Sequence, residues 1–180
     1  MTKLYAGVGY RKTPIKTLAV MIRLAHRLAK KGYTLRSGAA LGADAKFEKG
    51  CDLAKGKKEI WLPWKGFNDH TSKLIPKQVH YDIAKEIHPA WEYLTSGVKA
   101  LMARNVAQIL GEDGKTPVNL VICYTEDGVE SHHEVTKKSG GTGFAISIAG
   151  RYGIPVFNLK RENTISRINL FLDEYRIFED

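Results

Sequence analysis

The sequence is poor in cysteine and in acidic side chains, and it contains no long hydrophobic run. Its two cysteines, Cys51 and Cys123, provide neither a disulfide framework nor the ligand spacing of a metal site. Charged residues interrupt each apolar run well before the roughly 18 residues that a membrane-spanning helix needs. The N-terminal residues enter a strand-like pattern at once and leave no room for a signal peptide. We therefore expect a cytoplasmic protein that contacts no membrane and holds no metal.

The shortage of acidic residues leaves a strong positive charge. Lysine and arginine number 28 against 19 aspartates and glutamates, which gives a formal net charge of +9. This excess favours a polyanionic partner, because basic side chains close to a phosphate chain release condensed counterions. Much of the excess lies in short runs such as "HRLAKKG" and "VTKKSGG", which are also typical of solvated surface. Charge alone leaves a nucleic-acid partner open.

The apolar residues predict strands that alternate with helices along one domain, residues 1–180. The predicted strands cover residues 3–10, 33–38, 58–63, 117–126 and 154–159. The predicted helices cover residues 15–28, 43–56, 96–111, 141–153 and 164–175, with a further helix at 75–88 between two prolines. Because the main strands are nearly continuous apolar runs, they indicate a sheet that is covered on both faces. The fold class is therefore α/β, a single Rossmann-like domain with a mostly parallel sheet and helices on both faces.

Three glycine-bearing turns follow predicted strands: "AGVGYRKTP", "RSGAALGADA" and "KKSGGTGFA". Such turns expose backbone N–H groups at the N-terminus of a helix, where a phosphate binds well. The spacing matches neither the dinucleotide fingerprint nor the P-loop, so we expect no nicotinamide cofactor and no other resident cofactor. The alternative interpretation is that small residues serve only to pack each turn against its helix.

These segments resemble the DprA (Smf) family in the same order along the chain. "GVGYRKTP" is similar to the opening turn of that family, "SGAALGADAKFEKG" to its Ser-Gly-x-Ala-x-Gly-x-Asp loop, and "ARNVAQILG" to its Arg-Asn helix. "SGGTGFAISIAGRYGIPVFNL" is similar to the segment after the central strand of the family. The matches run from about residue 4 to residue 158 and suggest the SLOG superfamily of Rossmann-like domains, which also contains the LOG phosphoribohydrolases.

The resemblance implies a phosphate or nucleotide pocket. Its expected residues are Gly7, Gly9, Arg11, Ser37, Gly38, Gly42, Asp44, Arg104, Asn105, Gly140, Gly141 and Thr142. Guanidinium groups can pair with phosphate oxygens, hydroxyls and glycine N–H groups can add hydrogen bonds, and Asp44 can accept from a ribose hydroxyl. The alternative role of Asp44 is a carboxylate that caps or charges the first turn of its helix.

The chain departs from its relatives at two points. DprA proteins normally carry an additional domain or a longer flank, so DNA sequestration or transfer to a recombinase need not follow. LOG enzymes carry a catalytic glutamate in Gly-Gly-x-Gly-Thr-x-x-Glu, whereas Ile146 and Ser147 stand at the corresponding place here. We therefore expect a protein that is not an enzyme, with no catalytic residue. If the protein is nevertheless an enzyme, the candidate catalytic residues are Glu130 and Glu134, because they are the acids nearest to the third glycine turn.

Aromatic and histidine residues add two further candidates. The segment "KGKKEIWLPWKGFNDHTSK" combines basic residues with Trp61, Trp64 and Phe67, a composition that suits stacking on single-stranded bases, with Trp64 as the candidate. One alternative is that Trp61 and Trp64 pack against the sheet, and another is that the segment forms a lid over a nucleotide. In "ESHHEV", the adjacent histidines of an extended segment point to opposite faces, which argues against a metal site.

The leading hypothesis is a non-catalytic binder of a phosphate-bearing nucleotide ligand. Single-stranded DNA in a DprA-like recombination role is the first choice, favoured by the charge. A small nucleotide or nucleotide-derived signal is the alternative, favoured by the compact domain, and a LOG-like nucleotide N-glycosidase is a weaker one. Proteins of this fold family often self-associate, so a homo-oligomer is an expectation of the resemblance. The sequence leaves the ligand and the oligomeric state open.

Overall fold

A computed structural model describes the backbone of residues 2–177 and the side chains as far as residue 173. Within this part of the chain, five strands form one sheet in the order β3-β2-β1-β4-β5, and all four pairs are parallel. The strands are β1 (Leu4–Gly7), β2 (Thr34–Ser37), β3 (Lys58–Ile60), β4 (Leu120–Cys123) and β5 (Val156–Asn158). The α/β fold class is confirmed.

The order of the strands reverses between β1 and β4. The chain first builds outward from β1 through β2 to β3, then crosses back to place β4 on the other side of β1. Tyr5 of β1 is opposite Leu35 on one side and Leu120 on the other. In open parallel sheets, ligands bind outside the carboxyl ends of the strands at such a reversal.

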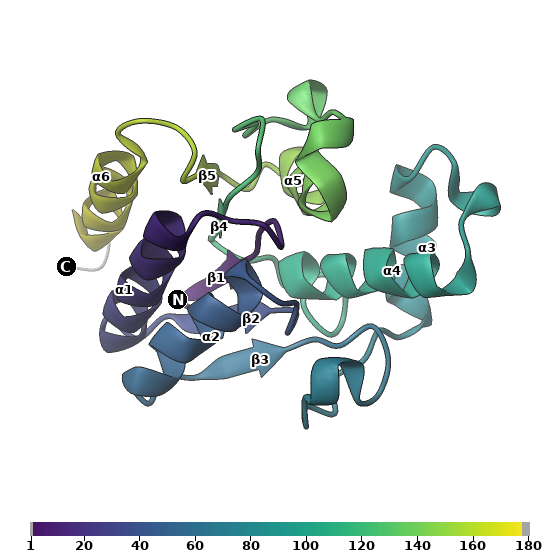
Figure 1. Ribbon diagram of the computed structural model, residues 1–180, viewed down its shortest axis with the longest axis horizontal. Coiled ribbons are helices and arrows are strands. Elements are labelled where there is room, and N and C mark those ends of the chain that lie inside the picture. The colour runs from purple at the N-terminus through teal and green to yellow at the C-terminus, as the bar shows by residue number, and fades with distance from the viewer. Residues whose placement is uncertain (1, 178–180) are drawn as a thin grey trace.

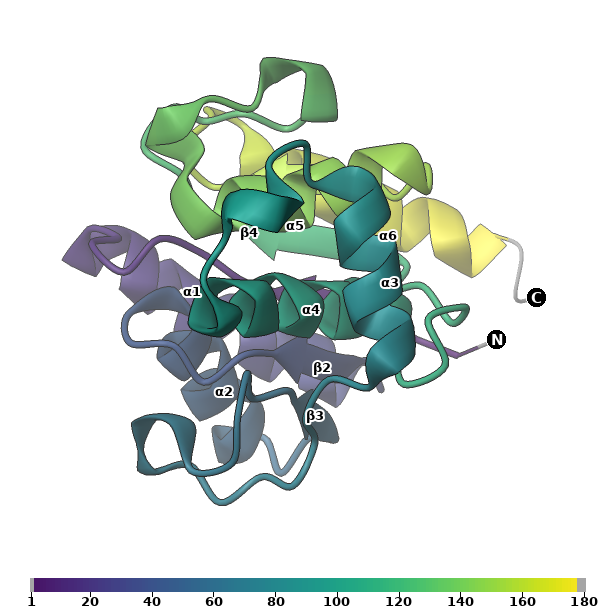
Figure 2. The same cartoon turned by 90° about the vertical axis from the view of Figure 1, so that its right-hand side faces the viewer.

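Helices cover both faces of the sheet (Figure 1, Figure 2). They are α1 (Ile15–Lys30), α2 (Ala43–Leu53), α3 (Gln78–Ile87), α4 (Ser96–Leu110), α5 (Gly140–Arg151) and α6 (Thr164–Ile177). Because successive strand residues point to opposite faces, Tyr5 packs into a core with α1, α2 and α6. Leu4 and Ala6 pack into a second core with α3, α4 and α5. Figure 2 shows α3 lying outside α4, in the layer farther from the sheet.

The ends of the helices differ slightly from the predictions. Helix α4 begins at Ser96 as predicted and is capped by Thr95, because the hydroxyl of Thr95 accepts a 3.3 Å hydrogen bond from the N–H of Val98. Helix α1 begins directly after Pro14 and extends to Lys30, two residues beyond the predicted end. Four short 3-10 helices stand in the loops of the described chain: η1 (Phe67–Asp69), η2 (Trp91–Tyr93), η3 (His132–Glu134) and η4 (Lys137–Ser139).

The helices of residues 2–177 include none with both the length and the apolar character that crossing a bilayer requires.

Candidate nucleotide-binding site

A cavity of about 350 Å³ lies at the carboxyl ends of β1 and β4, where the strand order reverses. Its walls come from the loop after β1, the N-terminus of α2, the inner face of α4 and the first turns of α5. It is lined by Val8, Gly9, Tyr10, Arg11, Lys12, Ala40, Asp44, Leu101, Met102, Arg104, Asn105, Gln108, Gly141, Thr142 and Ala145. The topology thus places the cavity where this kind of sheet binds ligands.

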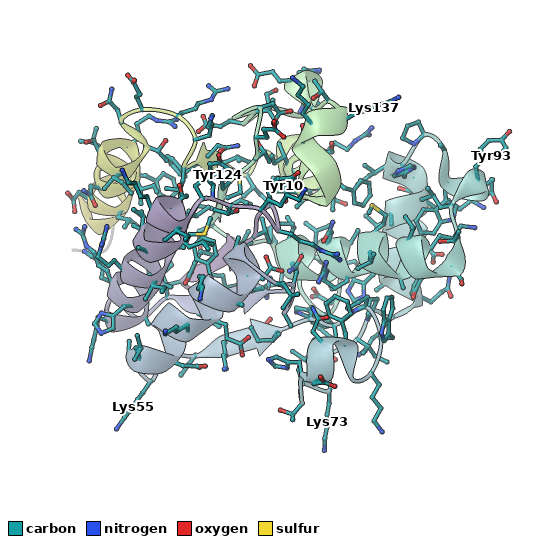
Figure 3. All side chains as sticks on the ribbon, viewed as in Figure 1. Tyr10, Lys55, Lys73, Tyr93, Tyr124 and Lys137 are labelled. Carbon is teal, nitrogen blue, oxygen red and sulfur yellow. The ribbon has the colours of Figure 1, made fainter. Side chains whose placement is uncertain are left out.

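The loop after β1 forms the rim. Its backbone continues the pairing with β4 beyond the strand, because the N–H of Tyr10 donates to the carbonyl of Tyr124 at 3.1 Å. Figure 3 shows Tyr10 between this loop and α5. The side chains of Arg11 and Lys12 are exposed, so both cations are available at the mouth of the cavity.

Asp44 lies in the first turn of α2 and is almost fully buried in the wall of the cavity. Burial raises the pKa of Asp44 to about 6, although the charge of Arg104 and nearby backbone N–H groups pull it down. Those N–H groups belong to Ala40, Gly38 and Gly9. The carboxylate lies in the first turn of α2, but it does not cap the helix and instead ties the loop after β1 to the turn after β2 while it also lines the cavity.

Arg104 crosses from α4 to the turn after β2. One of its terminal nitrogens donates to the carbonyl of Gly38 at 2.5 Å, and its guanidinium lies 5.8 Å from the centre of the Phe67 ring. Burial lowers the pKa of Arg104, as does the nearby charge of Arg11, while Asp44 opposes this. The Nε of Arg104 is buried without a hydrogen-bond partner among the described residues.

The first turn of α5 closes the opposite side of the cavity. The amide of Asn105 donates to the carbonyl of Gly141 at 3.2 Å and fixes α4 against α5. The helix has no side-chain cap, because the hydroxyl of Ser139 donates instead to Asp127 at 2.6 Å. A β-carbon on Gly141 would have no neighbour within 4 Å among the described residues, so there is open space beside its α-carbon.

The structure brings together most of the residues that the resemblance implied. Those that line the cavity are Gly9, Arg11, Asp44, Arg104, Asn105, Gly141 and Thr142. Those that lie outside its lining are Gly7, Ser37, Gly38, Gly42 and Gly140. Contact of any of them with a phosphate stays a prediction.

Three of the residues outside the lining, Gly7, Ser37 and Gly42, pack behind its wall. Ser37 is fully buried and its hydroxyl donates to the carbonyl of Gly7 at 2.6 Å, while a β-carbon on Gly7 would approach the Phe47 ring within 2.5 Å. Gly42 has a φ of +86° and lies so close to the backbone of Arg11 that a β-carbon would come within 2.6 Å of its carbonyl oxygen. These residues shape the wall from behind.

Trp64 stands apart from the cavity. Its side chain is 45% exposed and meets Phe67 edge to face, with 5.3 Å between the ring centres. Because Phe67 in turn covers Arg104, Trp64 is connected to the site through one intervening ring. Its neighbour Trp61 is buried, as the packing alternative predicts.

Two expectations about the loop before α5 are wrong. His132 and His133 belong to the 3-10 helix η3, and their rings lie 3.8 Å apart between centres, because the segment is not extended. Glu130 and Glu134 are not the acids nearest to the third glycine turn. Asp127 accepts from the hydroxyl of Ser139 directly before α5, whereas Glu130 is engaged by Arg167 at 2.9 Å.

Sequence reasoning missed several residues of the lining, of which Gln108 is the most informative. Its side chain is fully buried, and it follows Arg104 by four residues on the same helix. Residues at that spacing share a helix face. The signal that could have found it is therefore a polar residue one turn after the Arg-Asn pair, within an otherwise apolar run.

No protein-family profile matches the sequence, and a search of curated proteins finds no relative. Solved structures do match over nearly the whole chain. DNA processing protein A from Helicobacter pylori, which binds single-stranded DNA, is 17% identical, with a TM-score of 0.58 over 96% of this chain and 81% of that one. The Moco carrier protein from Chlamydomonas rheinhardtii is 16% identical, with a TM-score of 0.52 over 97% of this chain and 86% of that one. The chain therefore has a Rossmann-like fold of the kind found in DNA processing protein A, as the sequence resemblance implied.

Proposed function

We propose that the protein binds a phosphate-bearing nucleotide ligand in this cavity and does not convert it chemically. The observation that carries the proposal is a set of buried polar groups without partners along the cavity, namely the Nε of Arg104 and the amide of Gln108. Leaving such a group unsatisfied costs about 1–3 kcal/mol, and a polar ligand recovers that free energy. The volume of about 350 Å³ is within the roughly 300–1,000 Å³ typical of small-molecule sites.

The phosphate of the ligand lies, in this proposal, at the N-terminus of α5. The first N–H groups of a helix have no partner within it, and the helix dipole makes this end partly positive. The open backbone at Gly141 and the side chain of Thr142 supply hydrogen bonds there. Arg11 supplies the cation, and an anion beside it also relieves its repulsion of Arg104.

Binding without turnover is supported by the acids available. Asp44 is the one carboxylate in the lining, and glycoside hydrolysis usually employs a pair. Asp44 also accepts from the backbone N–H of Ala40 at 3.3 Å, which holds it in the wall. Incubation with nucleoside 5′-monophosphates should therefore release no free base above background. Release at enzymatic rates would replace this proposal with an N-glycosidase, and Asp44 would be the first residue to substitute.

Single-stranded DNA is the second candidate ligand. The net charge of +9 favours it, and so does the likeness of fold to a protein that binds single-stranded DNA. In that case the cavity holds one nucleotide of the strand, while neighbouring phosphates contact exposed lysines. Trp64, which is half exposed, is then placed to stack on a further base.

Titration against salt tests the proposal and separates the two ligands. We would measure the affinity of a nucleoside 5′-monophosphate and of a short oligothymidylate over a series of salt concentrations. A strand that contacts several phosphates should give a log–log slope of roughly −0.7 per phosphate. A single nucleotide held inside the cavity should give a shallow slope. If neither ligand binds at low salt, the proposed function is wrong.

A further inference from the structure

The polar side chain of Gln108 occupies a position that packing alone would give to an apolar residue. It lies in the middle of α4 with no exposed surface, and its neighbours Val106, Ile109 and Leu110 are buried in the core. Neither its amide oxygen nor its amide nitrogen has a hydrogen-bond partner among the described residues. The side chain nevertheless belongs to the lining of the cavity and is fully buried there, whereas Arg11 and Lys12 are exposed at the rim. We call the part of the cavity at Gln108 its closed end.

The surroundings of Gln108 are arranged to keep this amide in place. A β-carbon on Gly38 would come within 2.5 Å of the amide nitrogen of Gln108 and within 2.3 Å of a terminal nitrogen of Arg104. The absence of a side chain at Gly38 therefore makes room for both groups. A buried amide without partners destabilises the fold, whereas an apolar side chain of similar shape would avoid that cost. The cavity lining thus includes a polar group that no described residue satisfies.

The chemistry of this end differs from that of the rim. A glutamine amide offers a donor and an acceptor side by side in one plane, which complements a planar edge with an adjacent acceptor and donor. Nucleobases present such edges, and glutamine pairs with adenine in this way. The Nε of Arg104 adds one more donor and the carboxylate of Asp44 adds an acceptor. A phosphate, in contrast, has only acceptors and suits the cations at the rim.

We infer that Gln108 is a specificity residue that binds the base edge of the nucleotide, so that the base enters the closed end and the phosphate remains at the rim. This inference rests on the proposed function and adds to it the orientation and the class of ligand. The protein recognises a nucleotide by its base and does not bind sugar phosphates in general.

The test compares ligands that share the phosphate and differ in the base. Affinities of the wild-type chain are measured for four nucleoside 5′-monophosphates and for ribose 5-phosphate, which lacks a base. The same series is measured for Gln108→Met, which keeps the length of the side chain but removes both hydrogen-bonding groups. Gln78→Met is the matched control, because the amide of Gln78 is exposed and donates to Asp82 on the outer helix α3. Gln108→Leu is the second substitution should the first impair folding.

We expect the wild type and Gln78→Met to prefer at least one nucleotide over ribose 5-phosphate by roughly tenfold or more, since two hydrogen bonds contribute about 1–3 kcal/mol. Gln108→Met should lose most of this preference and keep its affinity for ribose 5-phosphate. An unchanged preference in Gln108→Met and Gln108→Leu, or an equal loss for ribose 5-phosphate, would overturn the inference while the proposed function stands. A wild type that binds none of the five compounds would overturn both.

Discussion

The turn after β2 and the turn that begins α5 have similar sequences, "SGAALG" and "SGGTG"; α2 begins directly after the first, and α5 begins at the second residue of the other. In both turns a serine hydroxyl and a glycine carbonyl are engaged by other parts of the protein: Ser37 and Gly38 in the first, Ser139 and Gly141 in the second. The turns differ in the space beside the glycine, because a β-carbon on Gly38 would come within 2.5 Å of Arg104 and of Gln108. In the second turn, Gly141 has open space beside it and lies in the wall of the cavity. The first glycine therefore makes room for two buried side chains, whereas the second has open space beside it.

The largest expected effect of a substitution in these turns is on folding, at Gly38. In Gly38→Ala, the new β-carbon would displace the buried guanidinium of Arg104 and the amide of Gln108. The hydrogen bond from the Arg104 guanidinium to the Gly38 carbonyl would be lost, and because a bond from a charged group contributes about 1.5–3 kcal/mol, we expect a loss of that order in the free energy of unfolding. Urea denaturation measures it. A variant as stable as the wild type would show that the two turns do not differ in packing.

The next effect is on binding, at Gly141. In Gly141→Asp, the carboxylate would lie near the first turn of α5, where an acid stabilises the helix and repels a phosphate. Because like charges in contact cost several kcal/mol, nucleotide affinity should fall by about 100-fold or more with no loss of stability. Isothermal titration measures the affinity.

Gly97→Asp is the matched control for that substitution. Gly97 is the second residue of α4, as Gly141 is of α5, and it lies outside the lining of the cavity. Its variant should bind nucleotide as the wild type does. Equal affinity in Gly141→Asp and Gly97→Asp would remove the phosphate from the N-terminus of α5.

Asp44 allows a test through pH, because its buried carboxylate joins the loop after β1 to the turn after β2. Its pKa in the folded protein, about 6, is above its ordinary value of 3.8, so the folded chain holds this proton more tightly than the unfolded chain. The stability that the protonated carboxyl contributes is therefore present below 3.8 and is lost as the pH rises through 6. Asp44→Asn lacks this titration. The stability of the variant relative to the wild type should rise over that window by roughly 3 kcal/mol, at about 1.36 kcal/mol per pKa unit.

Urea denaturation of both proteins at several pH values measures this difference. If the stability of the wild type and that of Asp44→Asn change with pH in parallel, burial does not raise the pKa of Asp44. In that case its carboxylate would be exposed to water in the cavity, and a role in binding a ribose hydroxyl would gain weight.

The sequence predicted the fold well because the fold depends on apolar patterns. Ala25 and Leu28 recur at helical spacing and are buried on α1, and the continuous run of β4 is buried on both faces. The pattern was less exact at the start of α1, where Ile15 is 85% exposed. It also located the edge of the sheet where the cavity lies, since parallel strands bring their ends together. Motif resemblance could not separate Gly141 from Gly38, because sequence does not record which side chains of distant elements lie beside each glycine. The burial of Gln108 depends on how α4 packs against the turn after β2.

The smallest expected effect concerns Trp64, which lies outside the cavity and contacts it through Phe67. Trp64→Ala removes one edge-to-face pair, worth about 0.5–1.5 kcal/mol, from a ring that is already half exposed, so the fold should tolerate it. The affinity for a mononucleotide should stay unchanged, because the cavity lining does not include this residue.

The affinity of Trp64→Ala for an oligothymidylate distinguishes the two candidate ligands. Stacking on a base contributes about 1–3 kcal/mol, so a strand that crosses this surface should bind the variant roughly tenfold or more weakly than the wild type. Fluorescence anisotropy of a labelled strand measures this, with Tyr93→Ala as the control, since Tyr93 projects from the periphery in Figure 3 and is 91% exposed. Equal strand affinity in the two variants would confine recognition to the cavity and favour a small nucleotide as the ligand.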